Sequence, residues 1–292
     1  MKARAALLLF MLGAAGCGYD ADPNQPTGFI QIKGSDTLVN AEQMLAEEFM
    51  KSYPQVFVAI TGGGSGVGIA SLINRSCDVA AASREMKPKE IAWARQRGVF
   101  PKEITVAFDG VAVIVHRNNP IEKLTLAELH DIFTGKVARW NALGGKDLPI
   151  VTLSREVSSG TYAYFKEQII HLGRKDGAEE FSSRTLLLTS SQTIVEEVAS
   201  NESAIGYLGM GYLSERVKTV RIGQEDQFWP ADLANVLSKK YPLSRPLYFY
   251  TNGEPAGVTR LFLDFTLSPQ GRQLLTEAGF VPLQNHVPTK NN

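Results

Sequence analysis

The sequence has no excess of charge of either sign. Lys and Arg together number 30, and Asp and Glu together also number 30, so the formal net charge at pH 7 is zero. Proteins that bind nucleic acids normally carry a basic excess or a basic stripe, and this composition therefore argues against a nucleic-acid partner. An anion bound by this chain must be held by local geometry, because no overall positive field attracts it.

Histidine and cysteine are also scarce, which limits metal and redox chemistry. The four histidines are scattered along the chain, at His116, His130, His171 and His286. None forms a cluster at the spacing of a metal site, so we predict no metal, no cofactor and no enzymatic activity, and a secreted phosphatase is disfavoured. The two cysteines are Cys17 and Cys77, and no disulfide is expected if Cys17 carries a lipid.

The N-terminal residues have the pattern of a targeting segment. Two basic residues precede an apolar run at residues 5–12 that is too short to span a membrane as a mature helix. The run ends in Gly-Ala-Ala-Gly-Cys, which resembles a bacterial lipoprotein cleavage box, although Ala14 stands where leucine is usual. We predict a signal peptide at residues 1–16, lipid on Cys17 and a flexible tether at residues 17–28. An ordinary signal peptide with an incidental cysteine is the alternative.

Strands, turns of small polar residues and helices alternate along the first part of the mature chain. Predicted strands at residues 29–33, 56–60 and 78–82 each end in a turn rich in Gly, Ser, Thr or Asp. Apolar residues at helical spacing follow the first two of these turns. This alternation indicates an α/β domain whose ligand loops lie at the carboxyl ends of its strands.

The glycine-rich turn at residues 62–68 does not match the common nucleotide motifs. Ile69 follows Gly68, so the Lys-Ser/Thr ending of a P-loop is missing, and the glycine spacing of a dinucleotide site is also absent. What remains is a turn whose backbone can approach a ligand closely, with the Ser65 hydroxyl at the start of a helix. A tight structural turn is the alternative.

The stretch at residues 155–161, Arg-Glu-Val-Ser-Ser-Gly-Thr, is the most suggestive of a binding site. It follows a predicted strand at residues 149–153 and precedes residues with helical spacing. A helix N-terminus offers unpaired N–H groups, to which Ser159 and Thr161 add hydroxyls and Arg155 adds a positive charge. These groups suit an anion, although a capped helix beside a surface arginine would have the same sequence.

Two later segments complete the predicted core. Residues 104–115 form a long apolar strand that is interrupted at Asp109-Gly110. A carboxylate inside such a strand is either a paired structural group or a group that faces a cleft. Residues 241–246 are predicted to be a turn and residues 247–250 a strand. The chain shows no repeat of fixed period and no low-complexity tract, and its 292 residues suffice for two domains.

Six stretches together resemble the phosphate-binding protein of the bacterial high-affinity phosphate ABC transporter. They are residues 34–37, 62–68, 82–84, 132–140, 155–161 and 241–250. The resemblance covers about residues 29–283 and implies an α/β, two-lobed periplasmic binding protein of type II, with mixed, mostly parallel sheets and the ligand in the cleft between the lobes. Lobe 1 would comprise residues 29–112 and 245–288, and lobe 2 would comprise residues 113–244.

The resemblance also implies a function and a set of binding residues. The chain would be a monomeric solute-binding protein, anchored through Cys17 in the periplasm or at the cell surface, that captures inorganic phosphate and delivers it to a membrane permease. The implied phosphate-binding residues are Ser35, Thr37, Leu38 through its backbone, Ser65, Ser83, Arg84, Arg155, Ser159, Gly160 through its N–H, and Thr161.

The chain departs from the family pattern at the acidic acceptor. Phosphate keeps one or two protons near neutral pH and must donate hydrogen bonds, whereas sulfate has no proton to give. Some family members carry an acidic residue where this chain has Arg84, so Asp36 or Asp109 is the predicted acceptor here, and Arg84 is either a ligand residue or part of an ion pair. A binding protein for sulfate, molybdate or tungstate, or a phosphate-sensing component, remains the alternative.

Overall fold

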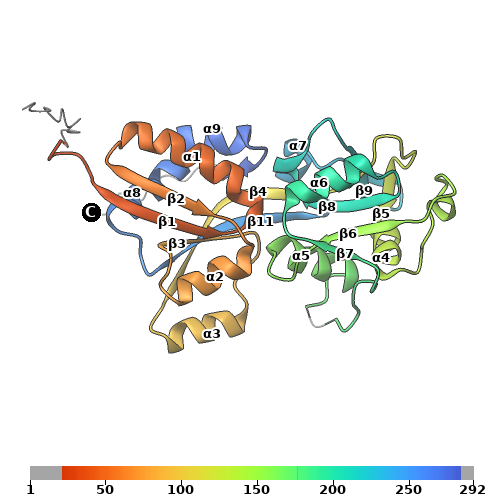
Figure 1. Cartoon of the computed structure of the whole chain (residues 1–292), viewed down its shortest axis with the longest axis horizontal. Helices are drawn as coiled ribbons and strands as arrows, with labels where there is room; N and C mark the ends of the chain where they lie inside the picture. Colours follow the sequence, from red (N-terminus) through yellow and green to blue (C-terminus); the bar gives the residue numbers. More distant parts are fainter. Residues whose placement is uncertain (1–21, 176, 284–292) are drawn as a thin grey trace, which may run out of the picture.

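Two long strands run through the middle of the molecule and belong to both of its lobes (Figure 1). Strand β4 spans Pro101–Val115 and strand β11 spans Ser244–Asn252. Residues 101–110 of β4 pair with β11, whereas residues 111–115 pair with β8 (Ala204–Gly209). A single strand therefore passes from the sheet of the first lobe into the sheet of the second.

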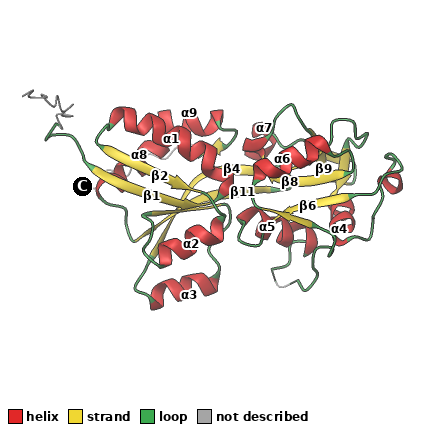
Figure 2. Ribbon diagram, viewed as in Figure 1, coloured by secondary structure: helices red, strands yellow, loops and turns green. Residues whose placement is uncertain are grey.

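The first lobe is a mixed sheet with helices on both faces. Its other elements are β1 (Gly28–Gly34), β2 (Val56–Thr61), β3 (Val79–Ala82), β12 (Val281–Pro282), α1 (Val39–Ser52), α2 (Ser65–Ile73), α3 (Pro88–Gln96), α8 (Gly257–Leu267) and α9 (Pro269–Glu277). The strand order is β2-β1-β3-β11-β4, and β1 to β3 are parallel. Helices α1, α8 and α9 cover one face, and α2 and α3 cover the other (Figure 2).

Close packing of α2 on the sheet depends on a glycine. A methyl group at Gly68 would lie 2.4 Å from the carbonyl oxygen of Lys33, which is closer than van der Waals contact permits. The lack of a side chain at Gly68 thus lets α2 lie directly against the end of β1. On the opposite face, Phe49 of α1 meets the edge of Phe262 of α8 with ring centroids 5.3 Å apart.

The second lobe surrounds an aromatic core. Its further elements are β5 (Lys123–Thr125), β6 (Val151–Arg155), β7 (Leu186–Leu188), β9 (Lys218–Gln224), β10 (Gln227–Trp229), α4 (Leu126–Thr134), α5 (Gly160–Phe165), α6 (Ser191–Ser200) and α7 (Leu233–Leu237). Phe165 of α5 stacks on Tyr207 of β8 with centroids 3.6 Å apart, and Phe133 of α4 meets Phe165 at 4.9 Å. These contacts fix the end of α5 against β8 and α4. The predicted two-lobed α/β fold is confirmed.

The bounds of two predicted strands were wrong. β4 begins at Pro101, three residues before the predicted start, and it continues through Asp109-Gly110, which pair with Arg245 and Ser244 of β11. The predicted turn ends earlier than expected: β11 already begins at Ser244 and contains Pro246. β11 pairs with β3 only from Tyr248 onward. Before that residue β11 has an edge-like position, where the missing N–H of a proline is tolerated.

The structure describes residues 22–175 and 177–283. The predicted signal peptide and the predicted lipidation site at Cys17 lie outside these residues. Within them, no helix is long and apolar enough to cross a membrane.

One carboxyl group is buried in α1 without an evident charged partner. Glu42 is 1% exposed, and its Oε1 atom accepts no hydrogen bond from the described residues. Burial raises the pKa of Glu42 from its ordinary value of 4.5 to about 8. The side chain is therefore protonated near neutral pH in the folded protein, whereas it ionises near pH 4.5 in the unfolded chain.

This shift predicts a pH-dependent stability. Between pH 4.5 and about 8 the folded state binds one proton at Glu42 that the unfolded state has lost, so unfolding becomes easier as pH rises. Relative to the Glu42→Gln variant, the free energy of unfolding of the wild type should fall by about 1.4 kcal/mol per pH unit in this window. Urea unfolding at several pH values measures it, with exposed Glu47→Gln on the same helix as the control. Parallel pH profiles of wild type and Glu42→Gln would contradict the prediction.

Candidate anion-binding site

Four hydroxyl groups from the two lobes gather where the strands end. Thr37 follows β1, Ser65 begins α2, Ser83 follows β3, and Thr161 lies in the first turn of α5 after β6. The Oγ1 atoms of Thr37 and Thr161 are 3.0 Å apart, and the Oγ atoms of Ser65 and Ser83 are 3.3 Å apart. All four side chains are buried. We call these four residues the hydroxyl cluster; the sequence predicted that all four would lie at one site.

The backbone of Gly160 packs closely against the opposite lobe. A methyl group at this position would lie 2.3 Å from the Oγ of Ser65 and 2.5 Å from the Oγ of Ser83. The adjacent Ser159 caps α5, since its Oγ accepts from the N–H groups of Thr161 and Tyr162. Residues 155–161 thus contain a capped helix N-terminus that also lies at the hydroxyl cluster, so the capped-helix and anion-site interpretations do not exclude each other.

Arg245 enters the hydroxyl cluster, although the sequence analysis did not predict it. Its Nη2 donates to the Oγ1 of Thr161 at 3.0 Å and to the Oγ1 of Thr37 at 3.3 Å. Nη2 and Nε also donate to Oδ2 of Asp109, at 2.8 and 3.1 Å. Burial raises the pKa of Asp109 above its ordinary value, while the Arg245 guanidinium and the Met210 N–H act in the opposite direction. The ion pair is almost completely buried, with Asp109 0% and Arg245 2% exposed.

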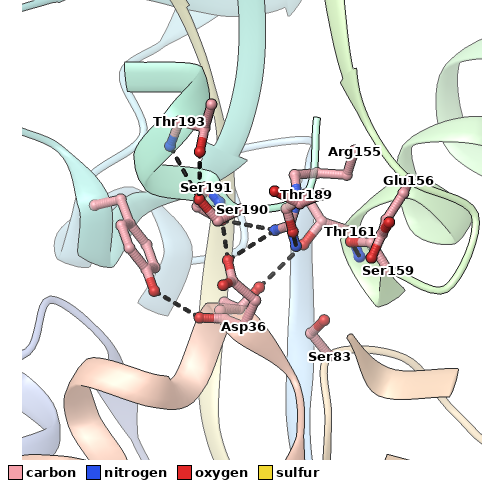
Figure 3. A network of polar contacts seen from close by, with 12 residues as sticks. Asp36, Ser83, Arg155, Glu156, Ser159, Thr161, Thr189, Ser190, Ser191 and Thr193 are labelled. Carbon is pink, nitrogen blue, oxygen red and sulfur yellow. Dashed lines mark hydrogen bonds and ion pairs between the residues drawn. The ribbon is translucent and has the colours of Figure 1, made fainter. Parts of the chain in front are cut away.

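The two terminal nitrogens of Arg155 are engaged in contacts between the lobes. Nη1 donates to Asp36 at 2.9 Å and to the Oγ of Ser191 at 2.8 Å, and Nη2 donates to the carbonyl of Thr189 (Figure 3). The carboxylate partner, Asp36, comes from the other lobe. The Nε of Arg155 is buried and has no hydrogen-bond partner among the described residues.

Asp36 lies at the centre of the contacts between the lobes rather than free in the cleft. Besides Arg155, its Oδ2 accepts from the N–H of Ser191 at 2.9 Å, and its carbonyl accepts from the hydroxyl of Tyr212 at 2.6 Å (Figure 3). The loop after β1 is thus tied to three segments of the second lobe. Both donors to Oδ2 of Asp36 come from the second lobe, so this carboxylate serves the contact between the lobes.

Two other predicted residues are engaged locally, and the side chain of a third has no partner among the described residues. Arg84 forms a two-pronged ion pair with Glu90 at 2.7 and 2.8 Å, because Glu90 sits in the first turn of α3 just beyond it. It does not reach the hydroxyl cluster, so the ion-pair alternative describes it. The N–H of Leu38 donates to the carbonyl of Ser35 at 3.0 Å, which occupies the predicted backbone donor. The Oγ of Ser35 is buried and has no partner among the described residues.

A groove between the lobes reaches the hydroxyl cluster from one side. It has a volume of about 860 Å³ and is bordered by Ser83, Arg84, Arg245, Tyr162, Tyr164 and Tyr248, among others. Between residues 22 and 283, apart from residue 176, no group of three or more His, Cys, Asp or Glu side chains could hold a metal ion. The arrangement is thus rich in hydrogen-bond donors and suits an oxyanion.

Comparison with known proteins identifies the family. A family model described as a PBP superfamily domain matches residues 20–270. The phosphate-binding protein PstS of Pseudomonas aeruginosa is 32% identical over 320 residues, which cover 99% of this chain and 97% of that protein. The chain belongs to the PstS family. PstS of Bacillus subtilis is 29% identical, with coverage of 97% and 93%.

Solved structures agree with membership of the PstS family. A putative phosphate ABC transporter substrate-binding protein with bound phosphate from Clostridium perfringens is 34% identical, with a TM-score of 0.79, and covers 88% of this chain and 100% of its own. An ABC-type phosphate transport receptor from Vibrio cholerae is 29% identical, with a TM-score of 0.69 and coverage of 87% and 100%. PstS proteins are substrate-binding proteins and not enzymes, in agreement with the sequence-based prediction.

The contact at Gly160 predicts that a single methyl group prevents full closure. In Gly160→Ala the Cβ atom would overlap the hydroxyls of Ser65 and Ser83 on the opposite lobe, so the lobes should stay apart. Small-angle X-ray scattering with added phosphate should show a larger radius of gyration for the variant than for the wild type. Val157→Ala, in an exposed side chain of the same loop, is the control. Equal radii for Gly160→Ala and wild type would refute the idea.

Proposed function

We propose that this chain captures inorganic phosphate in the periplasm or at the cell surface and delivers it to the permease of an ABC transporter. The observation that carries the proposal is the meeting of Thr37 and Thr161, one from each lobe, with the guanidinium of Arg245 in a buried position. Donors from both lobes can then surround one anion only when the lobes are closed. The names of the relatives and the phosphate bound in the Clostridium perfringens structure support the same ligand.

The binding residues divide between the lobes. Lobe 1 contributes the hydroxyls of Ser35, Thr37, Ser65 and Ser83, and lobe 2 contributes Ser159, the Gly160 N–H, Thr161 and the Nε of Arg155. Two of these atoms, Ser35 Oγ and Arg155 Nε, are buried polar groups with no partner among residues 22–175 and 177–283, and an anion would satisfy them. Hydrogen bonds to a charged group contribute roughly 1.5–3 kcal/mol each. Micromolar affinity corresponds to a binding free energy of about 8 kcal/mol, so several such bonds suffice even after the cost of closing the lobes is subtracted.

We assign Asp109, rather than Asp36, as the residue that accepts a hydrogen bond from the protonated oxygen of phosphate. Asp109 is fully buried beside Arg245, which itself contacts Thr37 and Thr161. Burial raises the pKa of Asp109, whereas the bonds from Arg245 and from the Met210 N–H act in the opposite direction and favour the ionised form. In that form Asp109 can accept a further hydrogen bond. Sulfate would bring unprotonated oxygens against this carboxylate and would be rejected.

We also propose boundaries for the two lobes and a location at a membrane surface. Lobe 1 comprises residues 29–112 and 245–288, and lobe 2 comprises residues 113–244. The change of sheet after residue 110 of β4 and the start of β11 at Ser244 support boundaries near these positions. A signal peptide at residues 1–16 and a lipid on Cys17 would hold the protein, as a monomer, on a membrane surface.

Calorimetry with phosphate and sulfate tests the ligand and the acceptor together. The mature domain, stripped of prior ligand, should bind phosphate and prefer it over sulfate by at least tenfold. Asp109→Asn should reduce this preference, because an amide no longer repels an unprotonated oxyanion. Asp36→Asn should weaken binding of both anions through its contacts with Arg155 and Ser191, but leave the preference intact.

The outcomes separate the rival ligands. Equal binding of sulfate and phosphate by the wild type would favour a general oxyanion carrier. An unchanged preference in Asp109→Asn, with a native circular dichroism spectrum, would remove Asp109 as the acceptor. His171→Ala, at a groove residue outside the hydroxyl cluster, serves as the control and should bind phosphate like the wild type.

A further inference from the structure

Arg245 differs from the other binding groups in its position relative to the lobes. Thr37, in the helical turn after β1, and Thr161, in the first turn of α5, belong to opposite lobes and must separate when the lobes open. Arg245 lies on β11, directly opposite Asp109 on β4 in the antiparallel register, and both strands run between the lobes (Figure 1). Its backbone therefore stays at the base of the cleft during a hinge motion.

The hydrogen bonds of Arg245 set the direction of two hydroxyl groups. A guanidinium nitrogen can only donate, so Thr37 and Thr161 are acceptors in their contacts with Nη2, whose two hydrogens are shared among these hydroxyls and Asp109. The proton of at least one of the two hydroxyls is then free for another acceptor, because only one proton can lie in the contact between them. An oxyanion is such an acceptor.

Four contacts fix the guanidinium in this place. Asp109 accepts from Nε and Nη2, the carbonyl of Ser83 accepts from Nη1 at 3.2 Å, and the ring of Tyr164 lies 5.5 Å from the guanidinium carbon. Desolvation makes a buried ion pair a poor source of stability, often no better than apolar side chains of the same volume. A buried, rigidly held pair between two hinge strands is better explained by ligand binding.

The groove between the lobes connects the side chain of Arg245 to solvent. Arg245 and Ser83 both border this groove, which has a volume of about 860 Å³. An anion that enters along the groove meets a cation whose orientation is already fixed, before the loops of the two lobes have closed. The loss of freedom on binding is small for such a preorganised group.

On these grounds, and on the basis of the proposed function, we propose that Arg245 is the fixed cationic base of the phosphate site. It contacts the anion directly and orients the hydroxyls of Thr37 and Thr161 toward it. Asp109 is then also a positioning residue, because it holds the guanidinium of Arg245 in the required direction. Arg155 differs from Arg245 because its Nη1 and Nη2 hold the lobes together through Asp36, Ser191 and Thr189, which leaves its Nε for the anion.

A double-mutant comparison separates ligand contact from simple charge compensation. Arg245→Gln alone would leave Asp109 buried without a partner, and its effect on the fold would obscure the result. We therefore compare Asp109→Asn with Asp109→Asn/Arg245→Gln, in which no buried carboxylate remains at this position, by calorimetry with inorganic phosphate. The double variant should bind at least tenfold more weakly than Asp109→Asn, because the anion has lost a direct donor. Arg260→Gln, on the exposed face of α8, is the control and should bind like the wild type.

Equal phosphate affinity of Asp109→Asn and the double variant would overturn the inference and reduce Arg245 to a counter-ion of Asp109. If the double variant does not fold, Arg245→Lys decides: it keeps the charge beside Asp109 but cannot reach Thr37, Thr161 and Ser83 at once. Arg245→Lys should then bind several-fold more weakly than wild type, and wild-type affinity would overturn the inference. Absence of phosphate binding by the stripped wild-type protein would instead refute the proposed function.

Discussion

The buried ion pair between Arg245 and Asp109 joins the two strands on which the rest of the molecule depends. It lies next to the point where β4 leaves the sheet of one lobe for the sheet of the other, and it contacts a hydroxyl from each lobe. Removing two charges from water is expensive, and the expense is offset only because the guanidinium and the carboxylate satisfy one another and their neighbours. The crossing of β4 between the two sheets and the base of the candidate site therefore involve the same pair of residues, Arg245 and Asp109.

Charge around the site is balanced pair by pair. Arg245 faces Asp109, Arg155 faces Asp36, and Arg84 faces Glu90. A cleft arranged in this way has little net charge to offer an anion, which agrees with the zero net charge of the chain. Recognition must rest on the directions of hydroxyl and N–H donors, and such directions can distinguish anions that carry the same charge but different numbers of protons.

The sequence predicted the residues whose place follows from local rules, and it failed where partners come from a distance. Thr37, Ser65, Ser83 and Thr161 follow strands in a repeated strand–turn–helix pattern, and the carboxyl ends of such strands meet at one edge. Arg245 was missed because Pro246 made its surroundings look like a turn, and because its partner Asp109 is 136 residues away. The ion pairs of Arg84 with Glu90 and of Arg155 with Asp36 could not be identified in advance, because sequence alone does not tell which carboxylate a long side chain will meet. A lone arginine and a lone aspartate in two apolar strands were the signal available for the missing pair.

The continuity of β4 through Gly110 limits how the protein can move. Residues on both sides of Gly110 belong to hydrogen-bonded ladders, with β11 on one side and β8 on the other, so no slack loop exists in this strand. An opening motion at this point would therefore have to bend or twist β4 itself, because no flexible loop in that strand could absorb it.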